Sequence, residues 1–143
     1  MYTVKSLKLT LDGAEKIMQA AVAKAKVIGV PMSIAIVDEG TNLFLFTRME
    51  GGKPHTVQIA IAKARAAASN QQPTGKIGST GNALDDFAAI ALPLIAGPDR
   101  YVTIPGGLPI FVDGQCVGGV GASGGTGAQD AEACQAGLDA IRK

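Results

Sequence analysis

Hydrophobic positions in the first third of the chain follow first the period of a helix and then that of strands. Between residues 11 and 28 they recur every three to four positions. Thr10 before them is a candidate cap and Gly29 after them a candidate stop, which predicts a helix over Leu11–Ile28. Two β-rich runs follow at Met32–Val37 and Leu43–Met49, separated by turn residues. We expect them to pair as an antiparallel hairpin.

The middle of the chain combines a second helical pattern with a polar, glycine-rich segment. Apolar side chains recur on one face of a helix that we expect at Thr56–Ser69. Residues 71–81 contain one proline and three glycines among polar residues, which predicts a surface loop. A short helix is expected at Asp85–Ile95, ending near Pro93, and a third strand at Tyr101–Ile104.

The last third predicts a hairpin, a glycine-rich loop and a final helix. Two apolar runs flank Asp113-Gly114, a dipeptide typical of two-residue turns with positive φ. Thr126 and Gln129 then have the spacing of a capping box. The apolar face of the final helix consists of Ala131, Cys134, Leu138 and Ile141. Five strands joined mainly by hairpins, with helices at both ends, predict a single α+β domain over residues 1–143.

The segment from Gly119 to Gly124 matches the G-x-G-x-x-G pattern of dinucleotide-binding folds, but its context differs. That fingerprint requires a following parallel strand with an acidic residue about 20 positions on, whereas only the final helix follows here. We therefore expect these glycines to permit close packing of backbones. The backbone amides of residues 123–126 could also hold a carboxylate, and this alternative stays open.

Composition and charge exclude several classes of function. The 13 Lys and Arg against 12 Asp and Glu are scattered, so we expect no nucleic-acid partner. The N-terminus lacks an apolar signal region and the longest apolar stretch is broken by Pro93, so we expect a cytoplasmic protein with no membrane partner. Small side chains and 19 glycines favour tight backbone contacts of the kind found between subunits, so we expect a homo-oligomer.

The two cysteines show no metal or redox spacing. Cys116 falls on a predicted strand and Cys134 on a predicted helix, with no C-x-x-C motif and no neighbouring histidine. We interpret both as small core residues, and we expect no metal site apart from a haem iron.

These pieces together resemble the GlcG/HbpS family, which also includes the C-terminal domain of PduO-type proteins. The resemblance covers nearly the whole chain, and its specific part is the glycine-rich block from Gly106–Ile110 through Ser123–Thr126 to Gln129-Asp130. The other matching pieces are Leu9–Leu11, Gly29–Pro31, Val37-Asp38, Arg48-Met49, Ile61–Ala64 and Ala136-Gly137.

The resemblance implies a fold and a range of functions. The implied fold is a five-stranded antiparallel sheet flanked by helices, similar to profilin-like domains, in subunits that form dimers or assemblies up to octamers. Members of the family are often encoded beside catabolic enzymes for small organic acids or diols, and some bind haem.

Two residues could bind a cofactor or substrate directly. His55 is the only histidine and lies in a glycine-flanked loop, where its imidazole could ligate haem iron or act as a general base; an exposed residue at a helix start is an equal alternative. Arg48 could pair with a substrate carboxylate or a haem propionate, or be an ordinary residue at a strand end.

The remaining candidates would complete the same site. Met49 could contact haem or pack in the core. Arg100 and Tyr101 would add a charge and a phenol if the chain segments converge. Asp38 is a second candidate for proton transfer. The walls of the cofactor site would come from Gly106, Gly107, Ser123, Gly124, Gly125 and Thr126.

Two classes of function remain. The protein could be a binding or sensing accessory protein of a catabolic pathway, holding a small ligand that could be haem. Alternatively, it could be a small catabolic enzyme for a carboxylated metabolite, with Arg48 orienting the acid and His55 or Asp38 transferring protons. We favour binding, since no nucleophile–base pair or set of metal ligands is visible in the sequence.

Overall fold

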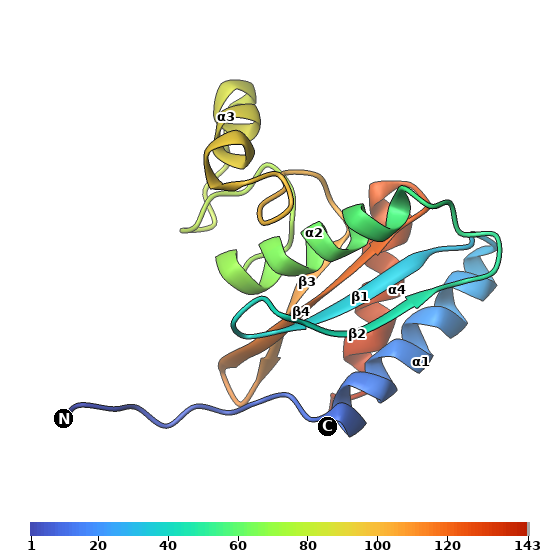
Figure 1. Ribbon diagram of the computed structural model, residues 1–143, viewed down its shortest axis with the longest axis horizontal. Coiled ribbons are helices and arrows are strands. Elements are labelled where there is room, and N and C mark those ends of the chain that lie inside the picture. Colours follow the sequence, from blue (N-terminus) through green and yellow to red (C-terminus); the bar gives the residue numbers. More distant parts are fainter. Residues whose placement is uncertain (143) are drawn as a thin grey trace.

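A computed structural model describes residues 1–142, and it contains a four-stranded antiparallel sheet with helices on both faces (Figure 1). The strand order is β2-β1-β4-β3, so β2 and β3 are the edge strands. In chain order the elements are α1 (Leu11–Ile28), β1 (Ser33–Asp38), β2 (Leu43–Arg48), α2 (Thr56–Asn70), α3 (Asp86–Ala96), β3 (Gly107–Val112), β4 (Gln115–Ser123) and α4 (Gly127–Asp139).

The prediction of five strands is wrong, because Tyr101–Ile104 does not join the sheet. Its side chains instead form hydrogen bonds to the segment around α3: Tyr101 Oη donates to Ile77 O, and Thr103 Oγ1 donates to Ala89 O. The β propensity of this segment had predicted a strand, but such propensity depends on a neighbouring strand edge with which to pair. The α+β class is confirmed with four strands among the described residues.

The predicted helix ends are confirmed where a side chain or a glycine defines them. Thr10 Oγ1 accepts a hydrogen bond from Gly13 N at 3.0 Å, and Gly29 ends α1 with φ of 86°. At α4 both halves of the capping box are present, between Thr126 and Gln129. The helix α3 differs from its prediction: it passes through Pro93 and ends at Ala96.

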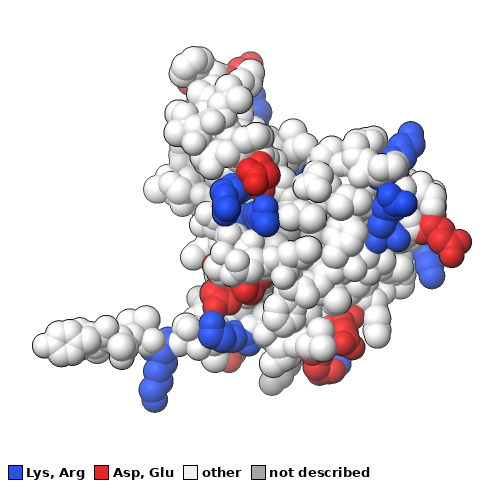
Figure 2. Space-filling view, in the orientation of Figure 1, with Lys and Arg blue, Asp and Glu red and all other residues white. Residues whose placement is uncertain are grey.

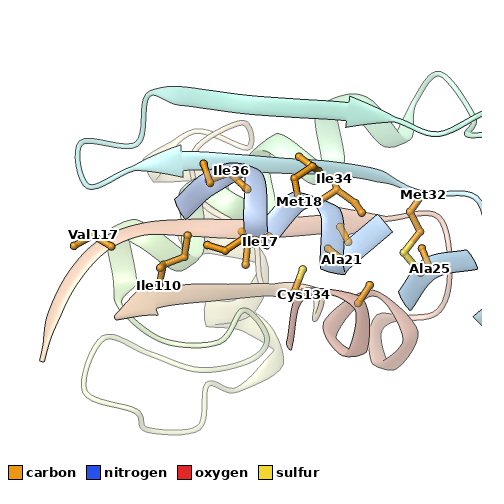
Figure 3. Close-up of a cluster of buried hydrophobic side chains, with 14 residues drawn as sticks. Ile17, Met18, Ala21, Ala25, Met32, Ile34, Ile36, Ile110, Val117 and Cys134 are labelled. Carbon is orange, nitrogen blue, oxygen red and sulfur yellow. The ribbon is translucent and has the colours of Figure 1, made fainter. Parts of the chain in front are cut away.

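The larger hydrophobic core lies between the sheet and the pair formed by α1 and α4 (Figure 3). Ile17, Met18 and Ala21 of α1 meet Ile34 and Ile36 of β1 there, and α4 contributes Cys134. The start of α1 and the end of α4 are neighbours, since Leu9, Thr10 and Ile141 line one shallow cavity.

The opposite face of the sheet is covered by α2 through very small side chains. Ala35 and Val37 of β1 contact Ala60, Ala64 and Ala68 of the helix. A Cβ atom at Gly119 or Gly121 would collide with the carbonyl oxygens of Ala64 or Ala60. The glycines of β4 therefore let the helix backbone lie directly on the strand, which confirms the packing interpretation of the G-x-G-x-x-G segment.

Two parts of the chain stand apart from these layers. The helix α3 projects away from the sheet, and the first few residues of the chain extend away from the body (Figure 1). In the part of the chain that the structure describes, no helix has the length and apolarity needed to cross a membrane.

Candidate functional site

A cleft of about 260 Å³ opens at the end of the sheet where β1 begins and β4 ends. Three connecting segments meet there: the α1–β1 turn, the loop between β2 and α2, and the β4–α4 loop. Its lining residues are Val30, Pro31, Gly51, Lys53, His55, Thr56, Ser123, Gly124 and Gly125. The lining has two basic side chains and no acidic one.

Register places Arg48, Ser33 and Ser123 in one row across the sheet beside this cleft. Ser33 pairs with Arg48 of β2 and with Ser123 of β4, and residues directly opposite one another project from the same face. The Ser33 side chain contacts Thr56 of α2, so this face is the one that α2 covers. The side chain of Arg48 therefore projects from the face of the sheet that α2 covers, but Arg48 is not one of the residues that line the cleft.

A chain of hydroxyl groups fixes the loop that carries His55. Thr56 Oγ1 donates to Lys53 O at 2.6 Å, and Ser33 Oγ lies 2.8 Å from Thr56 Oγ1. Because the Thr56 hydroxyl has one proton and donates it to Lys53, Ser33 must be the donor of the second bond. Both hydroxyl groups are buried, so the start of α2 is anchored to β1 directly beneath the cleft.

The wall formed by the β4–α4 loop requires glycine. Gly124 has φ of 148°, and a Cβ atom there would collide with Pro31 O. The two loops consequently touch through their backbones, and the amide of Gly125 is turned inward, where it donates to Asp130 Oδ1 at 2.9 Å.

A buried ion pair lies behind this wall. Lys63 Nζ of α2 donates to Asp130 Oδ2 at 3.0 Å and to Ala122 O at 2.9 Å, and the two charged side chains are 4% and 2% exposed. The pair thus joins α2 to β4 through Lys63 and to the Gly125 amide through Asp130. Sequence reasoning missed this pair, although Lys63 lies three positions after Ala60 and one before Ala64, on the helix face that packs against the sheet. A lysine on such a face was the available signal.

Several of the predicted site residues lie together at the cleft. His55, Ser123, Gly124 and Gly125 all line it. His55 is exposed at the N-cap position of α2, and its imidazole forms no hydrogen bond with another of the described residues. Lys53 also lines the cleft, although it was not among the predicted site residues.

Other predicted residues do not line the cleft. Gly106 and Gly107 are buried under α2 against Lys63, and Thr126 caps α4. Met49 packs toward the larger core, and its Sδ accepts a hydrogen bond from Met32 N at 3.4 Å. Arg100 and Tyr101 lie in the segment that follows α3. Tyr101 lines a different pocket, which shares no residue with the cleft.

Asp38 lies at the opposite end of β1 from the cleft. Its Oδ1 accepts hydrogen bonds from Gly40 N and Asn42 N, both at 2.9 Å, and so shapes the turn between β1 and β2. The five residue steps from Ser33 to Asp38 span about 17 Å of strand. Asp38 and His55 are therefore too far apart to act on the same small substrate.

The two cysteines lie on the elements predicted for them, on β4 and α4. Burial raises the pKa of the Cys134 thiol to about 12 and also raises the pKa of the half-buried Cys116. No group of three or more His, Cys, Asp or Glu side chains within residues 1–142 is arranged to hold a metal ion.

Residues 9–139 match the family model described as haem degrading protein HbpS-like. The chain is 35% identical over 131 residues to an uncharacterized 15.0 kDa protein in the dhaT-dhaS intergenic region of Citrobacter freundii, covering 92% of this chain and 90% of that one. It is 34% identical over 116 residues to protein GlcG of Escherichia coli, covering 80% and 81% of the two chains.

Solved structures show the same fold. The complex of PduOC with haem superposes with a TM-score of 0.82 at 27% sequence identity, covering 95% of this chain and 96% of that chain. A double mutant of HbpS from Streptomyces reticuli superposes with a TM-score of 0.83 at 30% identity, covering 99% and 92%.

Proposed function

Since the chain belongs to the HbpS-like family, as its resemblance to the GlcG/HbpS proteins indicated, we propose that it binds a small ligand in the cleft at the end of the sheet, with haem as the first candidate. The observation that carries the proposal is the position of His55, whose imidazole has no protein partner among the described residues and stands beside Lys53 in a fold that PduOC uses in a complex with haem.

The side chains at the cleft are of the types that bind haem in proteins. The His55 imidazole would ligate the iron, and Lys53 and Arg48 would pair with the propionates, because both side chains carry positive charge on the same side of the sheet. Val30 and Pro31 offer an apolar wall. Bound haem would supply a redox-active iron, and the side chain that ligates it would tune its reduction potential.

The size of the cleft favours a site shared between subunits. Its volume of about 260 Å³ lies below the range of roughly 300–1,000 Å³ of typical ligand pockets. One chain would therefore enclose only part of a haem group. This supports the proposed homo-oligomer. The rest of the proposal, an assembly from a dimer up to an octamer that works in the cytoplasm as an accessory protein of a catabolic pathway, follows from the sequence and its family resemblance alone.

A second candidate function is favoured by the polarity of the same cleft. Its basic side chains, the absence of acidic residues from its lining and its modest volume suit a small carboxylic acid. In that enzyme Arg48 would orient the carboxylate and His55 would transfer the proton. Asp38 would have no part in it, given its place at the far end of β1.

An absorption titration with haemin tests the haem proposal. We expect saturable binding with the spectrum of ligated haem, and we expect His55→Ala to change that spectrum because the nitrogen ligand is lost. Lys53→Gln should weaken binding while leaving the spectrum unchanged, since it removes only a propionate partner. Gln58→Ala is the matched control: Gln58 is exposed in the first turn of α2 and does not line the cleft.

Each result of the titration has a definite meaning. An unchanged spectrum in His55→Ala would contradict the assignment of His55 as the iron ligand. Failure of the unmodified protein to bind haemin saturably would overturn the haem proposal. Binding and turnover of small organic acids, with loss of turnover in His55→Ala, would then support the enzyme.

A further inference from the structure

The helix α3 is apolar on nearly every side and is not covered by the rest of the chain. None of its residues is buried, and its large side chains are strongly exposed: Phe87 by 81%, Ile90 by 66%, Leu94 by 72% and Ile95 by 82%. In the space-filling view α3 forms the projection at the top, and its surface is mostly uncharged (Figure 2). A helix that is hydrophobic all round is typical of a buried element.

Charge is confined to the ends of this projection. Asp86 opens the helix and pairs with Lys76, and the next charged residue along the chain is Asp99. Helices that lie on membranes carry a basic polar face, and α3 has none. Its surface therefore favours a protein partner with an equally uncharged face over a lipid surface.

The base of the projection is fixed to the body by hydrogen bonds. Asn70 Nδ2 and Tyr101 Oη both donate to Ile77 O, and Arg65 donates to the backbone of Thr41 and Asp99. The helix itself makes no extensive contact with another helix or strand within residues 1–142. An isolated helix of 11 residues is marginal in water, so α3 needs a partner surface to be stable.

The exposed apolar area of α3 is close to what an interface requires. Its large side chains present roughly 600 Å² of apolar surface, at the upper limit of patches on monomeric proteins. A stable interface buries about 800 Å² on each partner. In a two-fold dimer in which each copy receives the arm of the other, each partner buries its own arm and a receiving surface of similar area, and the two together exceed that threshold.

We propose that α3 is an oligomerisation arm that a second copy of this chain covers, with each copy burying the arm of the other. This inference rests on the proposed homo-oligomer and assigns it a surface. The chain also has exposed apolar side chains against which the arm of another copy can pack, at Leu43 and Phe44 of the edge strand β2.

Sedimentation of the double variant Phe87→Glu/Ile95→Glu tests the arm. We expect the unmodified protein to be a dimer or larger at micromolar concentration, and the variant to dissociate with a rise in Kd of roughly 100-fold or more, because charge cannot be buried in an apolar contact. Val27→Glu is the matched control, since Val27 is equally exposed on α1 and lies outside the arm. It should sediment as the unmodified protein does.

The outcomes separate this inference from the proposals on which it rests. Circular dichroism should show the variant folded, because both substituted side chains are exposed in the single chain. A monomeric unmodified protein would overturn the arm together with the proposed homo-oligomer. An oligomer that the double variant leaves intact would overturn the arm alone. Haemin titration of the unmodified protein tests ligand binding independently of either result.

Discussion

At the scale of single residues, the pair of Lys63 and Asp130 connects the interior of the protein to the cleft. The two carboxylate oxygens of Asp130 have different donors, since one accepts from Lys63 and the other from the amide of Gly125. The wall of the cleft therefore depends on a charge that lies out of reach of solvent. Buried pairs of this kind contribute little net stability, but removal of one partner is costly.

Substitution of Asp130 measures this dependence. Asp130→Asn leaves Lys63 as an uncompensated buried charge, and we expect the free energy of unfolding to fall by about 3–5 kcal/mol in urea denaturation. Glu132→Gln is the control on the same helix; it removes an exposed pair with Lys24, whose charged atoms are 3.8 Å apart, and should change stability by less than about 1 kcal/mol. Equal effects of the two substitutions would contradict the structural role of the buried pair.

Because its thiol is buried, Cys134 makes the free energy of unfolding depend on pH in the alkaline range. Its pKa is about 12 in the folded protein against an ordinary value of 9.0, so between these values the unfolded chain binds fewer protons than the native one. Stability therefore falls as pH rises from about 9 toward 12. Urea denaturation at pH 7 and pH 10 should show a smaller fall for Cys134→Ala than for the unmodified protein. Parallel losses in the two proteins would exclude this contribution.

At the scale of elements, α3 shows how a distant residue permits a proline inside a helix. Pro93 has no N–H, so the carbonyl of Ala89, four residues earlier, lacks its helical donor. The hydroxyl of Thr103 donates to that carbonyl at 2.7 Å in its place. The sequence predicted an end near Pro93 because this replacement comes from a segment ten residues further on, which no local pattern reveals.

A double-mutant cycle tests this exchange of donors. Thr103→Val should destabilise α3 by about 1 kcal/mol, because Ala89 O loses its partner. In a Pro93→Ala background the helix supplies its own donor, so the same substitution should have a smaller effect. Hydrogen exchange of the α3 amides measures both effects. Equal effects in the two backgrounds would show that Thr103 does not act through the Ala89 carbonyl.

Elements defined by local chemistry were predictable to within a residue or two. Thr10, Gly29, Asp113-Gly114 and the capping box at Thr126 each specify their own surroundings, and α1, the two hairpins and α4 follow from them. The segment Tyr101–Ile104 has the β propensity of a strand, but no strand edge lies beside it with which it could pair. Its conformation depends on tertiary contacts, which is why the fifth predicted strand is absent from the described residues.

At the scale of the whole molecule, the sequence located part of the candidate site through contiguous motifs. His55 and the glycine loop from Ser123 to Gly125 converge because β1 and β4 are neighbours in the sheet. Asp38 and Arg100 were assigned to the same site only because their side chains have suitable chemistry. In the fold, neither of them lines the cleft. Whether a charged residue faces a cleft depends on the end of the strand it occupies, which sequence patterns leave open.

The meeting of the start of α1 with the end of α4 has a consequence for the connectivity of the fold. Leu9, Thr10 and Ile141 border the same cavity, so the chain nearly closes into a ring on the face opposite α2. A short linker could join these two points, with new termini cut into the polar loop of residues 71–81. The cleft lies at neither junction. The order of the elements along the chain is thus separable from their arrangement in space.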